Sequence, residues 1–149
     1  MKQSTKILAC LLCCVLLFTS VFRCSGNISR NNFLTRYHVQ IINELADERY
    51  LDVHCKSKDN DLGLQHIEPN GGNYMFSFRI NFGATTLFWC NFWYRNLHAV
   101  FDVFEASTGF IGGRCGGGDT CTWKAQVDGF YLYNNDEQKY EYRYPWGTS

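Results

Sequence analysis

Histidine and cysteine are the side chains of this sequence best suited to catalysis, because an imidazole can act as a base and a thiolate as a nucleophile. The clearest pair is His54 and Cys55, which are adjacent. On a strand, adjacent side chains point to opposite faces, so these two cannot form a nucleophile–base pair. An RNA-cleaving site would need two imidazoles beside a cationic phosphate clamp, but the histidines lie in four separate segments, at His38, His54, His66 and His98. The sequence therefore predicts no catalytic residues and a protein that is not an enzyme.

Calcium binding is a second chemistry that the sequence suggests and then excludes. Asp59 and Asp61, with Gly63 after them, resemble the start of a calcium loop. An EF-hand loop requires Glu at its twelfth position, and counting from Asp59 that position is Asn70. We favour a hairpin turn with Asx-type hydrogen bonds, and we expect neither a metal nor a cofactor.

The first 26 residues have the layout of a secretory signal peptide. Two lysines precede an unbroken run of 12 apolar residues, Ile7–Phe18, and Cys24–Gly26 supplies small residues before a cleavage site. A membrane-spanning helix needs roughly 20 apolar residues, so this run is too short. We expect a leader over 1–26, a single secreted, extracellular domain over 27–149, and no insertion into a membrane. Asn27 begins an N-glycosylation sequon directly after the cleavage site.

Removing this leader makes the protein slightly acidic. The leader holds three of the 14 basic residues and none of the 14 acidic ones, so 11 basic and 14 acidic residues remain and the net charge is −3. A protein of this charge has no general attraction to phosphate backbones or to anionic lipid. We therefore expect no nucleic-acid partner.

Four of the eight cysteines remain in the mature domain, at Cys55, Cys90, Cys115 and Cys121. An even number in a short secreted domain predicts two disulfides, with three connectivities open. A bridge from Cys55 to Cys90 would fasten two strands across the core, and one from Cys115 to Cys121 would close a glycine-rich loop. The sequence does not decide between the pairings. A zinc site is the competing interpretation, but its ligands come in pairs two to four residues apart, and Cys55 and Cys90 have no such neighbours.

The elements that position these residues are predicted to be strands. Apolar and polar residues alternate with a period of two, which is typical of strands with one buried face. Two further segments are apolar on both faces, as expected for central strands; these are 86–94 and 97–104. About eight short strands separated by turn signals indicate a sandwich or a barrel. We favour an all-β fold, a small antiparallel β-sandwich stabilised by two disulfides, with strands at 37–41, 51–56, 74–80, 86–94, 97–104, 140–144 and within 121–133.

Aromatic residues make up 17% of the chain, and core packing explains most of them. Tyr140, Tyr142 and Tyr144 alternate along one strand. If they face outward, they are candidates for a contact surface. An alternative function is therefore a secreted defence protein or a carbohydrate-binding module that uses this tyrosine face.

Three blocks of the sequence resemble the plant self-incompatibility protein family, also called S-protein homologues. The first is similar to the family's "VHC-SKD-DLG" segment, the second to its "FSFR" and "TLFWC" segments, and the third to its C-terminal cysteine pair and "W…DG" segment. These blocks are, in order, Val53–Gly63; Tyr74–Arg79 with Thr85–Cys90; and Cys115 with Cys121–Lys124 and Asp128–Tyr131. With the flanking strands the resemblance spans 37–146, nearly the whole mature chain.

The resemblance implies a secreted β-sandwich with two disulfides and no known enzymatic activity. The founding members are stigma proteins that act as ligands recognised by pollen, which implies that this chain is a monomeric extracellular ligand for a cell-surface receptor protein. Recognition is expected on surface loops. Our first candidate is the Arg95–Asn96 turn. The second is the turn of Asp59, Asn60 and Asp61, although its place in a family-typical block argues for a structural role.

Overall fold

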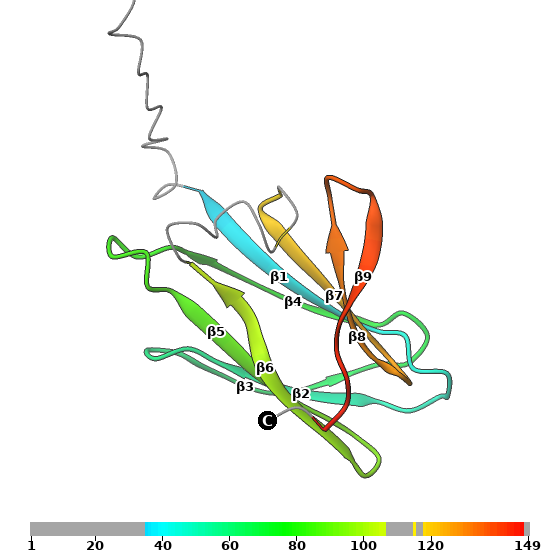
Figure 1. Cartoon of the computed structure of the whole chain (residues 1–149). Coiled ribbons are helices and arrows are strands. Elements are labelled where there is room, and N and C mark those ends of the chain that lie inside the picture. Colours follow the sequence, from blue (N-terminus) through cyan, green and yellow to red (C-terminus); the bar gives the residue numbers. More distant parts are fainter. Residues whose placement is uncertain (1–34, 107–114, 116–117, 148–149) are drawn as a thin grey trace, which may run out of the picture. The chain divides into compact units, whose positions relative to one another are not determined.

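The computed structural model describes residues 35–106, 115 and 118–147, which belong to one compact unit over 31–149. The predictions of a leader over 1–26 and of a glycosylated Asn27 lie outside these residues. Within the described part no helix is long and apolar enough to cross a membrane. Its elements are nine strands (Figure 1): β1 Arg36–Asn43, β2 Leu51–Lys56, β3 Asp61–Ile67, β4 Asn73–Arg79, β5 Leu87–Tyr94, β6 Leu97–Glu105, β7 Thr120–Gln126, β8 Gly129–Asn134 and β9 Lys139–Tyr144.

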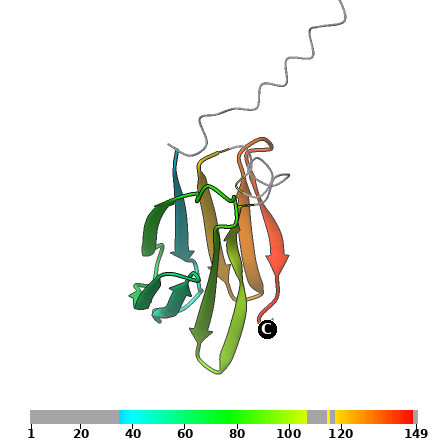
Figure 2. The ribbon, with the colours of Figure 1, turned by 90° about the vertical axis from the view of Figure 1, so that its left-hand side faces the viewer.

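The strands form two sheets that pack face to face, which confirms the predicted sandwich (Figures 1 and 2). One sheet has the order β4-β1-β7-β8-β9 and the other has the order β3-β2-β5-β6. Every pair of neighbours is antiparallel except β1 and β7, which run parallel, with Val39 opposite Cys121 and Ile41 opposite Trp123. The predicted antiparallel sandwich therefore contains one parallel pair. Parallel neighbours need a long connection, and here the chain forms β4 and all four strands of the opposite sheet before β7 begins.

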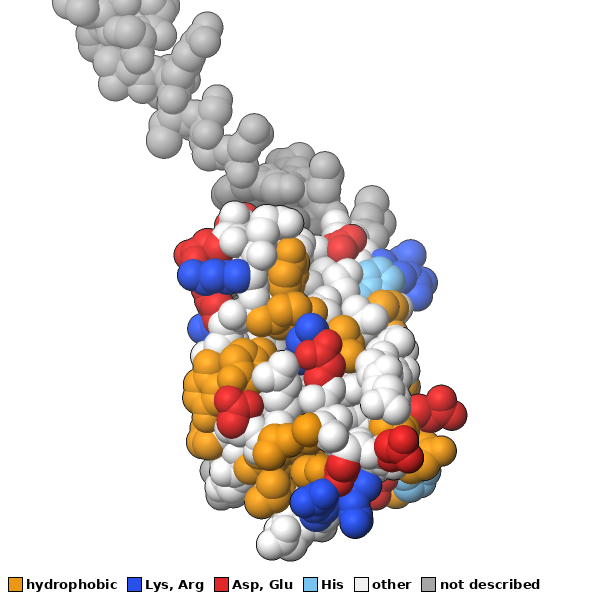
Figure 3. Space-filling model, turned by 90° about the vertical axis from the view of Figure 1, so that its right-hand side faces the viewer, with side chains coloured by type: hydrophobic (Ala, Val, Ile, Leu, Met, Phe, Trp, Pro, Cys, Tyr) orange, Lys and Arg blue, Asp and Glu red, His pale blue; other side chains and the backbone are white. Residues whose placement is uncertain are grey.

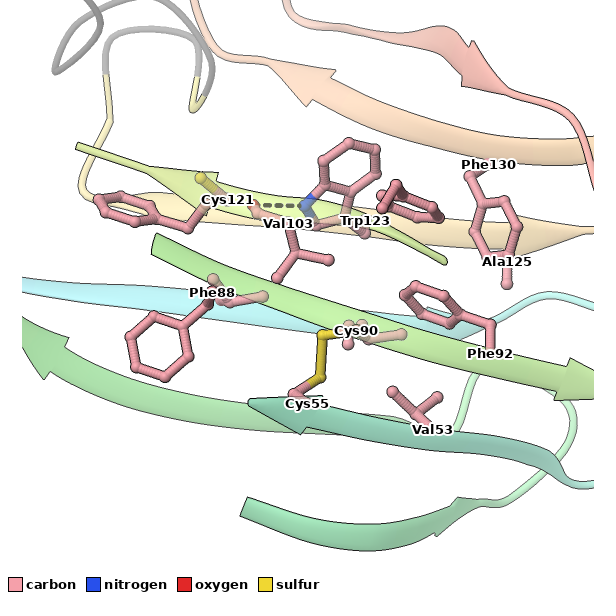
Figure 4. Packing of buried hydrophobic residues seen from close by; sticks show 14 of the residues in the cluster. Val53, Cys55, Phe88, Cys90, Phe92, Val103, Cys121, Trp123, Ala125 and Phe130 are labelled. Carbon is pink, nitrogen blue, oxygen red and sulfur yellow. Dashed lines mark hydrogen bonds between the residues drawn. A yellow bond between two sulfur atoms is a disulfide. The ribbon is translucent and has the colours of Figure 1, made fainter. Parts of the chain in front are cut away.

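The core lies between the two sheets and follows from the alternation of the sequence. Along β1 the exposed and buried side chains alternate strictly, and β2 and β7 repeat the pattern. Trp123 is almost fully buried, and its indole N–H donates a hydrogen bond of 3.1 Å to the carbonyl of Val103 in the opposite sheet (Figure 4). Aromatic rings fill the space beside it, with Phe92 at 4.7 Å from both Phe101 and Phe130 between ring centroids. Such pairs add to the free energy gained from burial alone.

Two disulfides are present, between Cys55 and Cys90 and between Cys115 and Cys121. The structure thus decides the pairing that the sequence left open, and the first bridge lies elsewhere than expected. Cys55 and Cys90 are directly opposite each other on the neighbouring strands β2 and β5. The bridge therefore joins two strands of one sheet, on the face turned toward the core (Figure 4), and does not cross from sheet to sheet.

Two expectations for individual strands are wrong. β3 was not predicted as a strand; it pairs with β2 and forms an edge of the four-stranded sheet. The segments 86–94 and 97–104 were expected to be buried on both faces, yet β6 is the other edge of that sheet, and the outward side chains of Trp93 and His98 are exposed. Apolar residues on the outer face of β5 led to this error.

A bulge in the β8–β9 pair changes the predicted tyrosine stripe. Tyr142 is opposite Tyr131, whereas Tyr144 is opposite Phe130, so the register shifts by one residue at Arg143. An extra residue in one strand turns the following side chain to the other face. Tyr144 therefore points into the sandwich, where its ring lies 4.5 Å from that of Phe101.

Candidate functional site

The two predicted contact turns lie at opposite ends of the sandwich. β2 and β5 are antiparallel neighbours, with Lys56 opposite Trp89 near one end and Asp52 opposite Trp93 near the other. The turn that contains Asp59 and Asn60 follows Lys56, whereas the Arg95–Asn96 turn follows Trp93 and Tyr94. One flat partner surface cannot contact both turns at once. We call the end of the sandwich with the turn of Asp59 and Asn60 the pocket end, and the end with the Arg95–Asn96 turn the Arg95 end.

At the Arg95 end, the guanidinium of Arg95 is engaged within the chain. It forms an ion pair with Asp47 in the β1–β2 connection, and it lies 5.2 Å from the ring centroid of Tyr94. Asp47 also pairs with Arg49, at 3.2 Å from its Nε. Arg95 has a φ of 55°, whereas Asn96 is outside the left-handed region, as in a type II′ hairpin turn.

Charge and hydrogen bonding are consistent with this arrangement. Burial alone would raise the pKa of Asp47, but hydrogen bonds from Tyr94 and Arg95 and the nearby positive charges hold it below its ordinary value. Arg95 therefore connects two loops as well as facing solvent. Asn96 is exposed, and within the described residues its side chain makes no hydrogen bond.

At the pocket end, Asp61 is also engaged within the chain. Its carboxylate lies 2.5 Å from Nε2 of His54 and 2.9 Å from Nζ of Lys56, and it accepts a hydrogen bond of 3.0 Å from the N–H of Gly63. The hydrogen bond from His54, followed by those from Lys56 and Gly63, holds the pKa of Asp61 well below its usual range. Asp61 is the first residue of β3 and fastens that strand to β2.

Asp59 and Asn60 occupy the exposed part of the turn. The N–H of Asn60 donates to Oγ of Ser57 at 3.1 Å, and the N–H of Ser57 donates to the carbonyl of Asn60 at 2.8 Å. These bonds close the capped hairpin turn that we favoured over a calcium loop. Within the described residues, no group of three or more His, Cys, Asp or Glu side chains is placed to hold a metal ion.

A pocket of about 420 Å³ opens beside this turn. It lies between residues 57–60 and the β4–β5 connection, 80–86, which joins the two sheets. The connection is held by Asn81, whose Nδ2 donates to Oγ1 of Thr85 at 2.9 Å and whose backbone N–H donates to Oγ1 of Thr86 at 3.0 Å. The amide of Thr85 in turn donates to Oδ1 of Asn81 at 2.9 Å. Two ordered connections therefore frame the opening.

The wall of the pocket is aromatic and its rim is charged. Phe78 and Phe88 pack together with ring centroids 4.5 Å apart, and Trp89 lies beside them. Lys58, Asp59 and Arg79 line the opening, and none of these three charged side chains forms an ion pair or hydrogen bond within the described part of the chain. The sequence pointed to the 57–60 turn and to a turn at Asn81, but not to their meeting, because this depends on the antiparallel pairing of β2 with β5, in which Lys56 is opposite Trp89.

Three of the four histidines lie on the outer face of the four-stranded sheet, which the sequence did not indicate. His66 Nδ1 lies 2.6 Å from Oδ1 of Asp52, and the ring of His98 stacks on Trp93 at 5.3 Å. His54 lies on the same face, opposite to the bridged Cys55, as its position in the strand predicted. His66 and His98 belong to the two edge strands of this sheet, and His54 lies on β2 between them.

Four tyrosines of β8 and β9 form a cluster on the outer face of the five-stranded sheet. Tyr131 lies 5.3 Å from Tyr142, and Tyr133 lies 5.0 Å from Tyr140. Nζ of Lys124 lies 4.2 Å from the Tyr140 ring centroid. The outward aromatic surface thus uses two of the three tyrosines predicted for it, together with two from β8.

Comparisons with known proteins agree with this fold. The family model described as plant self-incompatibility protein S1 matches residues 38–146. S-protein homolog 29 of Arabidopsis thaliana is 30% identical over 146 residues, covering 98% of this chain and 99% of the relative. S-protein homolog 2 of the same plant is 34% identical over 111 residues, covering 74% of this chain and 68% of the relative.

Two further comparisons concern a named self-incompatibility protein and a solved structure. Self-incompatibility protein S1 of Papaver rhoeas is 34% identical over 109 residues, covering 72% of this chain and 76% of the relative. A solved structure described as that of SPH (self-incompatibility protein homologue) proteins, "a widespread family of small, highly stable, secreted proteins from plants", has a TM-score of 0.52 and 20% identity, covering 75% of this chain and 95% of the other. The chain belongs to the plant self-incompatibility protein S1 family.

Proposed function

We propose that this protein is a secreted extracellular ligand that a cell-surface receptor recognises through its surface loops. Membership of a family that includes a self-incompatibility protein of Papaver rhoeas supports this proposal. The observation that carries it is the pocket end, where the 57–60 turn and the end of β4, which belong to different sheets, present charged side chains that have no partner in the described part of the chain. Loops on a rigid scaffold are a common location for recognition residues.

The receptor contact is assigned to the pocket end in preference to the Arg95 end. Arg95 and Asp61 are held by other side chains, so a partner must compete for them. Asp59 and Asn60 are exposed beside the pocket. Asn96 remains a second contact candidate, at the opposite end of the molecule.

The test is a charge exchange at the pocket rim. The double variant Lys58→Glu/Asp59→Lys keeps the net charge and changes only exposed side chains, so we expect unfolding stability within about 0.5 kcal/mol of wild type. We expect the response of the receptor-bearing cells to be lost. Asn96→Ala is the matched variant at the other end and should leave the response intact. A full response with the exchange, and a lost response with Asn96→Ala, would move the contact to the Arg95 end.

The alternative is a secreted defence protein or carbohydrate-binding module. Its specific support is the cluster of Tyr131, Tyr133, Tyr140 and Tyr142, since aromatic rings can stack on sugars. A glycan array separates the two functions: strong binding that is lost in Tyr142→Ala, with no effect of the rim exchange on any cellular response, favours the carbohydrate-binding function. Turnover of an RNA or ester substrate by pure protein would instead indicate an enzyme.

Export and a monomeric state belong to the same proposal. The proposed leader over 1–26 should be absent from the exported protein, and N-terminal sequencing should begin at Asn27. On the face seen in Figure 3, hydrophobic side chains form separate patches with acidic and basic side chains between them. Large continuous apolar patches mark stable interfaces, so this face supports a monomer, which sedimentation analysis can test.

A further inference from the structure

The rim of the pocket has more positive charge than negative charge. Lys58 stands on one side and Arg79 on the other, and the acidic side chain among the lining residues is Asp59. Arg36 lies directly opposite Arg79 in the β1–β4 pair, and both arginines are exposed. Like charges directly opposite each other on a sheet are destabilising. In the described part of the chain no acidic side chain pairs with either arginine. An anion bound from outside would therefore reduce the repulsion between them.

The wall behind these charges accepts an apolar group. Phe78 and Phe88 are fixed by mutual packing, and Trp89 is half-buried at the same wall. A ligand that places an anion between Lys58 and Arg79 can therefore lay an apolar group against these rings. The volume of about 420 Å³ is within the range of small-ligand pockets.

The neutral polar side chains of the pocket are already paired. The side-chain amide of Asn81 is bonded to Thr85, and the hydroxyl of Thr86 accepts from the backbone N–H of Asn81. A sugar would depend on neutral groups of this kind for its hydroxyls, whereas an anion depends on the cations, which are free. The pocket therefore favours a charged ligand over a neutral saccharide.

From these observations we infer that the pocket end binds an acidic residue that is adjacent to an aromatic or aliphatic residue on an exposed segment of a protein partner. The inference rests on the proposed function and names the chemistry of the receptor segment. The carboxylate binds between Lys58 and Arg79, and the neighbouring side chain packs on the half-buried Phe78 and Trp89.

The experiment uses ¹⁵N-labelled exported protein and three blocked dipeptides, acetyl-Asp-Phe-amide, acetyl-Asn-Phe-amide and acetyl-Lys-Phe-amide. With the Asp peptide we expect chemical-shift changes at the amides of 57–60 and 80–86 and at the Trp89 indole, with a dissociation constant on the order of 1 mM. The Asn peptide should bind at least about threefold more weakly, as for loss of an exposed charge pair, and the Lys peptide more weakly still. Added salt should weaken only the Asp peptide.

Variants assign the effect to the rim. Arg79→Gln should weaken the Asp peptide by about threefold to fivefold and leave the Asn peptide unchanged. Lys139→Gln removes one positive charge at the far edge of the five-stranded sheet and should change nothing. The spectrum of each variant reports whether the fold is intact. Equal binding of the Asp and Asn peptides, shifts outside the pocket, or an unaffected Arg79→Gln variant would overturn the inference.

Failure of this inference is distinct from failure of the proposed function. If the dipeptides do not bind but the Lys58→Glu/Asp59→Lys exchange still abolishes the cellular response, the pocket end remains the receptor contact. The inference that the receptor segment carries an acidic residue is then wrong. If the Asp peptide binds at the pocket but the exchange leaves the response intact, the ligand chemistry stands and the pocket is not the receptor contact.

Discussion

Replacing Asn43 is expected to destabilise the fold more than any exposed substitution proposed above. Asn43 is the one polar side chain that is fully buried among the described residues. Its Nδ2 donates to the carbonyls of Arg49 at 3.0 Å and Ile67 at 3.1 Å, and its Oδ1 accepts from the N–H of Leu45 at 3.1 Å. One amide group therefore holds the end of β1, the β1–β2 connection and the end of β3 together.

The magnitude follows from what Asn43→Leu leaves behind. Leucine fills a similar volume, so the change removes hydrogen bonds without opening a large cavity. Each buried donor or acceptor that loses its partner costs about 1–3 kcal/mol. Because the contact with Arg49 is only partly buried, water can replace it, and we expect a total loss of about 3 kcal/mol. Small domains have a total stability of about 5–15 kcal/mol, so this is a large fraction.

Urea unfolding followed by tryptophan fluorescence measures the loss. With a slope of about 1–3 kcal/mol per molar urea, the midpoint should fall by about 1–3 M at unchanged slope. The amide of Leu45 should also lose its protection from hydrogen exchange. Asn91→Leu is the matched control, since Asn91 lies on the outer face of β5; it should stay within about 0.5 kcal/mol of wild type. A loss below about 1 kcal/mol for Asn43→Leu would refute this account of the hydrogen bonds.

Three further outcomes are expected. Trp123→Phe leaves the buried carbonyl of Val103 without its donor and should cost about 1–3 kcal/mol in urea unfolding; an unchanged midpoint would contradict this. Because the pKa of Asp61 is lower in the folded state, its contribution is present above its ordinary value of 3.8 and is lost as the pH falls below it; the difference in urea midpoint between wild type and Asp61→Asn should therefore shrink progressively below about pH 4. Thiol titration of the denatured exported chain should find no free sulfhydryl, and removing the bridge with the longer loop should cost about 4 kcal/mol against about 2 for the shorter one; similar losses from both would argue against the loop-entropy explanation.

Local sequence patterns predicted the strands that have a strictly alternating face and missed the one that does not. β1 and β2 alternate between apolar and polar residues and were recognised. β3 contains Gly63 and has mostly exposed or half-buried side chains, as an edge strand does, so its period is weak. The inward orientation of Tyr144 could not be predicted either, because the bulge depends on how β9 pairs with β8 and not on the alternation within β9.

The candidate site was partly predictable for a similar reason. The sequence identified Asp59 and Asn60 as a turn from their residue types. It did not indicate that Arg95 pairs with Asp47, which lies 48 residues away in the β1–β2 connection. It also did not place the 80–86 connection beside the turn, since this depends on the pairing of β5 with β2. Contacts between distant segments decide which exposed charges are free to bind a partner.

The parallel pairing of β1 with β7 has a consequence for synthesis of the protein. One backbone edge of β1 pairs with β4, but the other must wait until residues 120–126 have been made. A nascent chain that ends before Thr120 therefore has an unpaired strand edge in the middle of its future sheet, and such edges can pair with other chains. This edge of β1 is therefore covered only when the chain has been made as far as β7, Thr120–Gln126, of its 149 residues.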